Sequence, residues 1–195
     1  TDTLVGTLIS STSNTQRLSS LGYITVPSSN ISGNTLIAAS ASSITLAKTA
    51  TYAAQTTAVP QTSSYKLASF TLSGNNVEDV NLDTVAVNFT GAASFTAADL
   101  TDVVLKIDGA VVGSPKGTVA ATGESYSISK VLPKNGTMVL EVWATIGSTV
   151  TAADTIMAEM TVSGVGALSS VASTTAAMVD GQVITAAVGS ITATL

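Results

Sequence analysis

The amino-acid sequence predicts an all-β protein, an antiparallel β-sandwich or barrel that carries an extended N-terminal arm. Three observations lead to this prediction. From Tyr65 onward, short segments of alternating apolar and polar residues are separated by turn residues at regular intervals. No long segment shows the apolar period of an amphipathic helix. The first 32 residues hold two alternating apolar pieces that stand apart from the regular pattern.

The expected strands of the sandwich follow one another along the chain, and turn signals separate them. Asp108-Gly109 is a strong signal for a two-residue hairpin turn. Thr96 is a suitable N-cap for a single helical turn over residues 96–100. The strands are expected at residues 65–72, 80–89, 103–107, 110–112, 125–131, 138–146, 156–162 and 183–191.

The segment 138–146 is the most hydrophobic of the expected strands, so we expect it near the centre of a sheet. A turn built on Pro133 and Asn135-Gly136 precedes it. The residues expected to supply much of the core or its lining are Val139, Leu140, Val142, Trp143 and Ile146.

The composition excludes several classes of protein. Of the 195 residues, 45% are hydrophobic and only 10% are charged, and the formal net charge is −5. The chain has no His and no Cys, which excludes histidine-dependent triads, thiolate zinc sites and disulfides. Its seven Lys and Arg residues are scattered, whereas nucleic-acid binding needs a basic stripe. We therefore expect no enzyme activity, no cofactor and no nucleic-acid partner.

Carboxylates are the remaining candidates for chemistry. Glu141 and Glu159 could form a glycosidase pair, although acidic residues in alternating strands more often belong to solvated faces. Lys66, Asn88 and Glu141 could be combined into an intramolecular amide bond, which their spacing alone does not support. An oxygen-rich turn could bind Ca²⁺, but an ordinary turn explains it as well, and we expect no metal site. That turn contains Asn75, Asn76, Glu78, Asp79 and Asp83.

No segment of the sequence predicts a membrane span. Residues 18–47 carry no charge, but Gly22, Pro27, Gly33 and several Ser residues interrupt them, and no run of 18 apolar residues occurs. A basic segment followed by an apolar one is also missing from the beginning of the chain. We expect an exported, processed protein that is located outside the cell or on its surface.

The arm, residues 1–32, is expected to join one subunit to another, and residues 33–195 are expected to form the sandwich. Isolated strands cannot bury their apolar side chains or pair their backbone, so the two pieces of the arm need a partner sheet. A floppy terminus left by processing is the alternative. The candidate inter-subunit residues of the arm are Leu4, Val5, Leu8, Ile9, Leu21, Ile24 and Val26.

The last segment of the chain repeats an earlier one. Gly33-Asn-Thr-Leu-Ile-Ala-Ala39 is similar to Gly181-Gln-Val-Ile-Thr-Ala-Ala187, and a Ser-Ile-Thr triplet follows each. The final strand could therefore pair with a neighbouring subunit or close its own sandwich, and we favour closure within the chain. The inter-subunit candidates of this strand are Ile184, Val188 and Ile191.

Covalent glycans could replace the hydration that the missing charges do not supply. Asn30, Asn88 and Asn135 each begin an N-glycosylation sequon. The Ser- and Thr-rich segments 10–20 and 40–63 are equally suited to hydroxyl-linked glycans.

Several segments resemble immunoglobulin-like (Ig-like) β-sandwich modules of secreted bacterial surface proteins. The resemblance rests on Tyr65–Gly74, Glu78-Asp79-Val80, Leu132–Thr137 and Gly181–Thr192. It implies an Ig-like antiparallel β-sandwich and an adhesive or polymer-forming role at the cell surface.

Two functions are compatible with these observations. The first is a structural subunit of an extracellular, pilus-like filament in which copies of the chain join by β-strand addition, so that its partners are copies of itself and, where present, covalent glycans. The alternative is an adhesive or carbohydrate-binding module of a larger surface or S-layer protein. That alternative requires an exposed aromatic platform, for which the candidates are Tyr23, Tyr52, Tyr65, Tyr126 and Trp143.

Overall fold

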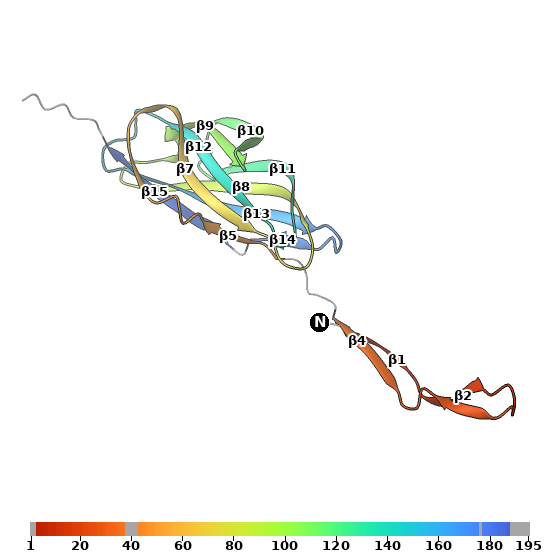
Figure 1. Ribbon diagram of the computed structural model, residues 1–195. Helices are drawn as coiled ribbons and strands as arrows, with labels where there is room; N and C mark the ends of the chain where they lie inside the picture. The colour runs from red at the N-terminus through yellow and green to blue at the C-terminus, as the bar shows by residue number, and fades with distance from the viewer. Residues whose placement is uncertain (1–2, 38–42, 176, 188–195) are drawn as a thin grey trace, which may run out of the picture. The chain divides into compact units, whose positions relative to one another are not determined.

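The computed structural model describes residues 3–37, 43–175 and 177–187. Figure 1 shows their strands, coloured along the chain from red to blue. The chain divides into two compact units, residues 1–40 and residues 41–195. The predicted boundary at residue 32 falls inside a strand of the first unit, because Ile31–Ile37 pairs with the beginning of the chain.

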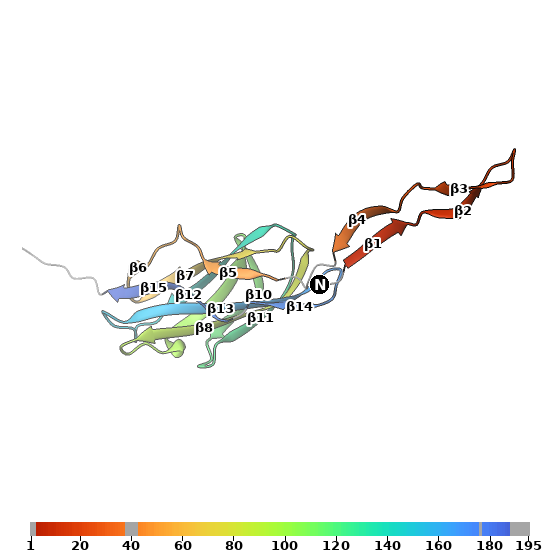
Figure 2. The ribbon, with the colours of Figure 1, turned by 90° about the horizontal axis from the view of Figure 1, so that it is seen from below.

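The N-terminal unit is a two-stranded antiparallel ribbon (Figure 2). Strand β1 (Thr3–Leu8) pairs with β4 (Ile31–Ile37), and β2 (Ser11–Gln16) pairs with β3 (Tyr23–Val26). The turn between β2 and β3 is closed by a hydrogen bond of 2.9 Å from the Arg17 N–H to the Gly22 carbonyl. The two apolar pieces of the predicted arm are therefore paired within the chain instead of extending as free strands.

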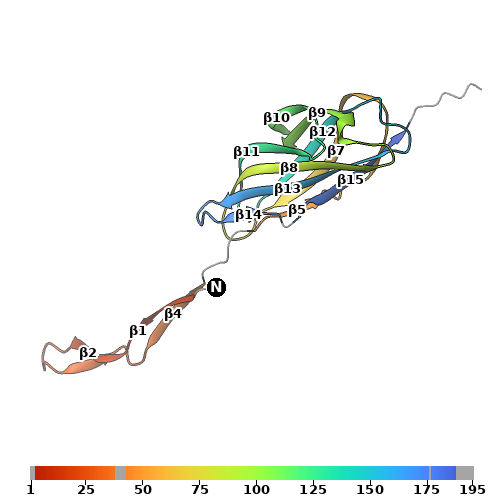
Figure 3. The ribbon, with the colours of Figure 1, turned by 180° about the vertical axis from the view of Figure 1, so that it is seen from behind.

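The second unit is a β-sandwich of two sheets, which Figure 3 shows from behind. The order of the first sheet is β10 (Ala110–Thr118), β9 (Leu100–Ile107), β12 (Thr137–Ile146), β7 (Gln61–Ser73) and β5 (Thr45–Lys48). The order of the second is β11 (Glu124–Leu132), β8 (Val80–Ala92), β13 (Thr155–Gly166), β15 (Val179–Ala187) and β6 (Gln55–Ala58), and β14 (Ala172–Thr174) also pairs with β13. The predicted all-β class and the predicted β-sandwich are confirmed, and every described ladder is antiparallel except the one between β15 and β6.

Strand β12 lies between β9 and β7, as its hydrophobicity predicted. Leu140, Val142 and Ile146 are buried in the core, but Val139 is 38% exposed and Trp143 is only partly buried. The prediction that Val139 and Trp143 supply the core was wrong, because side chains alternate along a strand. The even-numbered residues of β12 face the other sheet, so both of these odd-numbered residues lie on the outer face.

The edge of the sandwich is closed by a segment that changes sheets. Strand β5 pairs with β7 of the first sheet, whereas β6 pairs in parallel with β15 of the second. The sequence pattern does not predict β5 and β6, because each has only four residues with little apolar alternation. On its other side β15 pairs with β13, so the final strand closes its own sandwich, the arrangement that we favoured.

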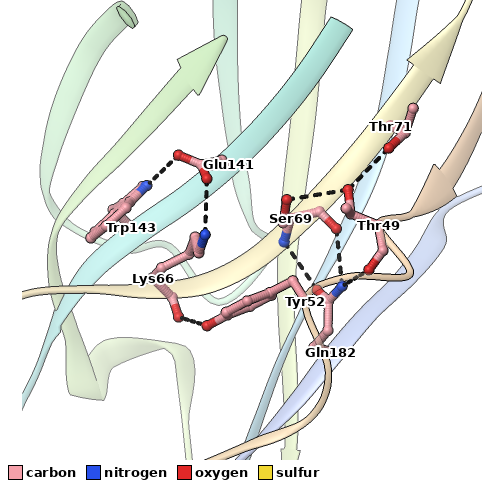
Figure 4. A network of polar contacts seen from close by, with 8 residues as sticks. All are labelled: Thr49, Tyr52, Lys66, Ser69, Thr71, Glu141, Trp143 and Gln182. Atoms are coloured by element: carbon pink, nitrogen blue, oxygen red, sulfur yellow. Dashed lines mark hydrogen bonds and ion pairs between the residues drawn. The ribbon is translucent and has the colours of Figure 1, made fainter. Parts of the chain in front are cut away.

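A buried amide connects the two sheets at this edge (Figure 4). Gln182 of β15 is 4% exposed, and its Oε1 accepts a hydrogen bond of 3.0 Å from the Ser69 N–H of β7. Its Nε2 donates to the carbonyls of Ser69, at 3.0 Å, and Thr49, at 3.2 Å. The Thr49 hydroxyl lies 3.2 Å from that of Ser69. Since buried polar groups cost free energy when unpaired, this arrangement fixes the position of β15 against β7.

Two turns are connected by the buried carboxylate of Asp154. It accepts hydrogen bonds from the backbone N–H groups of Thr151, at 2.7 Å, and Ser94, at 2.8 Å, and from both hydroxyls. These hydrogen bonds, the backbone ones first, lower the pKa of Asp154 to about 2. Nearby, the predicted turn after Thr96 is a 3₁₀ helix (Ala97–Asp99), and Thr96 donates to the Asp99 carboxylate through its N–H and its hydroxyl.

Acidification is expected to destabilise the protein through Asp154. In the unfolded chain the Asp154 carboxyl has an ordinary pKa of about 3.9. The ionised group therefore stabilises the fold fully above about pH 4. This contribution is lost as the pH falls from about 4 toward 2. Asp154→Asn should therefore lower the urea midpoint at pH 7, and the difference from the wild type should shrink by pH 2.

The matched control for this measurement is Asp180→Asn, because Asp180 is exposed on β15. We expect its urea midpoint to stay close to that of the wild type at pH 7. A pH-independent difference between wild type and Asp154→Asn would contradict the assigned role of the carboxylate.

Candidate assembly surfaces

One face of the ribbon formed by β1 and β4 is apolar. Leu4 lies opposite Leu36, and Leu8 lies opposite Ile31. Residues directly opposite each other in an antiparallel pair share a face, and residues two apart along a strand do so as well. All four side chains therefore project from the same side of the ribbon, with Gly6 between the two pairs. We call this surface, made of Leu4, Leu8, Ile31 and Leu36, the leucine face.

The opposite face of the same ribbon carries hydroxyl groups. Val5 lies opposite Thr35, and Thr7 lies opposite Ser32, with 3.4 Å between the hydroxyl oxygens of Thr7 and Ser32. Between these two pairs β4 has one residue more than β1, which forms a bulge. The bulge keeps Leu8 and Ile31 on the same face as Leu4 and Leu36. The ribbon therefore has one apolar and one mainly polar side.

The side chains of the leucine face are uncovered within their own unit. Their exposed fractions are 69% for Leu4, 60% for Leu8, 56% for Ile31 and 67% for Leu36. Burying a side chain of this size completely contributes about 1.5 to 3 kcal/mol. Since an isolated two-stranded hairpin is only marginally stable in water, the ribbon gains most from a partner that covers this face.

The structure places the seven candidates of the arm within the ribbon unit, but it brings only two of them together on the leucine face. Leu4 and Leu8 lie there, whereas Val5 lies on the opposite face. Ile31 and Leu36, which lie opposite Leu8 and Leu4, were not predicted as inter-subunit residues, because no local pattern shows which later strand pairs with β1. The remaining four candidates lie in the half of the unit that contains β2 and β3: Ile9 between β1 and β2, Leu21 in the turn, and Ile24 and Val26 in β3.

The C-terminal candidates have a different position. Ile184 pairs with Ile156 in β13, is fully buried, and belongs to the core of its own sandwich. A neighbouring subunit cannot reach it while β15 keeps this pairing. Val188 and Ile191 lie outside the described residues.

The outer face of the first sheet carries a polar and aromatic network (Figure 4). The Lys66 ammonium lies 3.0 Å from a Glu141 carboxylate oxygen, and the Trp143 indole N–H donates to the other oxygen at 3.1 Å. The Lys106 ammonium lies 3.9 Å from the centre of the Trp143 ring. Tyr52 donates to the Lys66 carbonyl. The indole is therefore bonded at its edge and has a cation over its ring.

Two pKa values reflect this network. Partial burial opposes ionisation of Glu141, but the hydrogen bonds from Lys66 and Trp143 hold the pKa of this carboxyl below its ordinary value. Desolvation, and then the nearby Tyr65 and Glu141, raise the pKa of Tyr52 to about 12. At neutral pH the network therefore holds an ionised Glu141 carboxylate beside the neutral phenol of Tyr52.

The predicted alternatives for carboxylate chemistry are contradicted by the positions of the residues. Glu141 is in β12 of the first sheet and Glu159 is in β13 of the second, each on the outer face of its own sheet, so they cannot act as a pair. Asn88 is also in the second sheet, and its Nδ2 donates to Glu159 at 3.2 Å. The combination of Lys66, Asn88 and Glu141 is therefore not assembled.

The oxygen-rich turn uses its oxygens internally. The Asn75 Oδ1 accepts from the Val77 N–H at 2.6 Å, and the buried Glu78 carboxylate accepts from the N–H groups of Leu168 and Ser169. Asp79 accepts from the Lys134 N–H at 2.8 Å. Among the described residues, no three acidic side chains are grouped so that they could hold a metal ion.

The three sequon residues differ in accessibility. Asn135 is exposed in a turn with a positive φ of 57°. Asn30 is exposed, and its Oδ1 accepts a hydrogen bond of 2.7 Å from the Ser10 N–H. A glycan would be attached to the Nδ2 of Asn30, which takes no part in this bond. Asn88 is half-buried, and its Nδ2 is the donor to Glu159. Asn30 and Asn135 are therefore better acceptors than Asn88.

No described helix has the length and apolar character needed to cross a membrane.

No protein-family model matches the sequence, and no curated protein matches it either. Among solved structures, AggA, the major subunit of aggregative adherence fimbriae type I from Escherichia coli, is 12% identical, with 75% of this chain and 94% of that chain covered and a TM-score of 0.35. The CooA pilin subunit from enterotoxigenic Escherichia coli is 12% identical over 76% of this chain and 99% of its own, with a TM-score of 0.33. AvmM, which catalyses macrocyclization in alchivemycin A biosynthesis, is 10% identical over 79% and 92%, with a TM-score of 0.36.

The position of Trp143 on the outer face predicts a modest cost of truncation. Leu140→Ala should lower the free energy of unfolding by about 2 to 5 kcal/mol, since Leu140 is fully buried. Trp143→Ala should cost clearly less than this, because the side chain lies outside the core, on the outer face of the sheet. Urea unfolding of both variants checks the order, and an equal or larger loss for Trp143→Ala would contradict the assigned position.

Proposed function

We propose that the protein is a structural subunit of an extracellular filament, and that the N-terminal ribbon joins one copy to the next. The observation that carries this proposal is the leucine face, four large aliphatic side chains that are 56% to 69% exposed on a ribbon with no second layer. An uncovered apolar sheet face is typical of an interaction surface.

The manner of joining follows from the pairing within the ribbon. Because β1 and β4 already satisfy each other's backbone groups on one side, the ribbon offers a preformed face and two outer edges. A prepaired ribbon loses less conformational entropy on docking than a free strand. A contact between the ribbon of one copy and a different surface of the next does not close, so it propagates into a fibre.

The surface chemistry supports an extracellular location. Only 10% of the residues are charged, so a dispersed chain has little colloidal protection. Burial by neighbouring copies would remove part of this weakly charged surface from water. Glycans attached at Asn30 or Asn135 would hydrate what remains, and both residues are exposed.

Substitutions on the two faces of β1 test the proposal in the full chain. Leu8→Asp places a charge on the leucine face, and Thr7→Asp places the same charge on the opposite face of the same strand. Both positions are exposed, so neither variant should change the melting temperature of the sandwich. Leu8→Asp should raise the concentration needed for filament formation at least about tenfold, since the loss of one buried leucine exceeds 1.4 kcal/mol.

Thr7→Asp should assemble nearly as the wild type does. Sedimentation and negative-stain electron microscopy, over a range of protein concentrations, measure filament formation by both variants. Equal assembly of Leu8→Asp and wild type would show that the leucine face is not the joint.

A second function is favoured by one observation, the position of Trp143 and Tyr52 on the outer face of the first sheet. An adhesive or carbohydrate-binding module would use such aromatic rings as a platform. In this case the purified protein should remain monodisperse in electron micrographs, and glycan binding should disappear in Trp143→Ala. Filaments that form equally well with Trp143→Ala would favour the first function.

A further inference from the structure

A groove of about 310 Å³ opens at the edge of the sandwich, between β5 of the first sheet and the segment leading into β15 of the second. Figure 1 shows these strands side by side. Ile44 is buried at the base of the groove, and Leu46 and Val179 pack partly against the core. The residues that line it are Ile44, Thr45, Leu46, Thr175, Ala177 and Val179.

Backbone edges border the groove on both sides. Strand β5 is the last strand of its sheet and pairs only with β7. The described ladder between β15 and β6 covers Ile184 to Ala187, so it does not reach Val179–Val183. The two sheets are therefore not bridged at this place by a paired strand, and the core is approached from outside through apolar side chains.

The chemistry of the groove matches the ribbon. None of the residues that line this groove is charged. Of two other grooves of the sandwich, one is lined in part by Lys48 and the other in part by Glu78, Asp79 and Lys134. The described ribbon, residues 3–37, has a single charged residue, Arg17, in the turn at the far end from β1 and β4. An uncharged apolar groove and an uncharged apolar face can cover each other without desolvating a charge.

We propose that this groove receives the leucine face of the ribbon of a second copy of the chain. This inference rests on the proposed function and adds the acceptor surface to it. Each copy carries one ribbon and one groove, so every contact is head to tail and the filament is polar.

Charge placed in the groove tests the proposal. Ala177 is exposed, so Ala177→Glu should keep the melting temperature of the wild type. It should raise the concentration needed for filament formation at least about tenfold, since a carboxylate would be buried unpaired under the ribbon. The matched control is Ala110→Glu, the same change at an exposed residue at the start of β10, and it should assemble normally.

Cross-linking tests the same contact without disturbing it. The chain has no Cys, so single substitutions give unique reactive sites. We expect a mixture of Leu8→Cys and Ala177→Cys chains, treated with a short bismaleimide, to give a heterodimer under assembly conditions. A mixture of Leu8→Cys and Ala110→Cys chains should give none above the level of unassembled protein.

The outcomes separate this inference from the proposed function. If Leu8→Asp blocks assembly but Ala177→Glu does not, the ribbon joins the copies and the groove is not its acceptor. If neither variant affects assembly, neither the leucine face nor the groove joins the copies, and both assigned surfaces are wrong. If Leu8 and Ala177 cross-link only when both cysteines are in one chain, the ribbon covers its own sandwich, and the inter-copy contact is wrong.

Discussion

The buried amide of Gln182 is the interaction on which the rest of the arrangement depends. It bonds the final strand of one sheet to Ser69 in the other, at the edge where β5 and β6 change sheets. Because its Oε1 and Nε2 are both paired, any shift of β15 would leave buried polar groups unsatisfied. The network therefore holds β15 against β7 within one chain, so β15 cannot exchange into a neighbouring sandwich while these bonds remain.

Because β15 pairs within its own sandwich, the N-terminal ribbon is the candidate surface for assembly. The ribbon satisfies its backbone along one side, but it has one layer and cannot bury its own leucine face. A second layer has to come from elsewhere, and the hydrophobic contribution of four aliphatic side chains makes that layer favourable. The proposed assembly would add a preformed ribbon face, which differs from the exchange of a single strand.

The carboxylates of the sandwich act in structure. Asp154 connects two turns, Glu78 accepts the N–H groups of a distant loop, and Glu141 pairs with Lys66 beside Trp143. In a chain with so few charges, each of these groups is used to hold backbone or a cation in place. The outer network around Trp143 in particular satisfies the indole N–H and covers part of the ring, which accounts for a tryptophan outside the core.

The sequence by itself determined the strands of the sandwich from Tyr65 onward, the hairpin at Asp108-Gly109 and the central place of 138–146, because alternation and turn residues are local signals. Only the tertiary structure decided which strands share a sheet. That choice separated Glu141 from Glu159, paired the ribbon segments with each other, and brought Ile31 and Leu36 beside Leu8 and Leu4. It also recruited the short strands β5 and β6, whose few residues carry no periodic pattern. Pairing between distant segments depends on the packing of the whole sandwich, and no window of the sequence contains it.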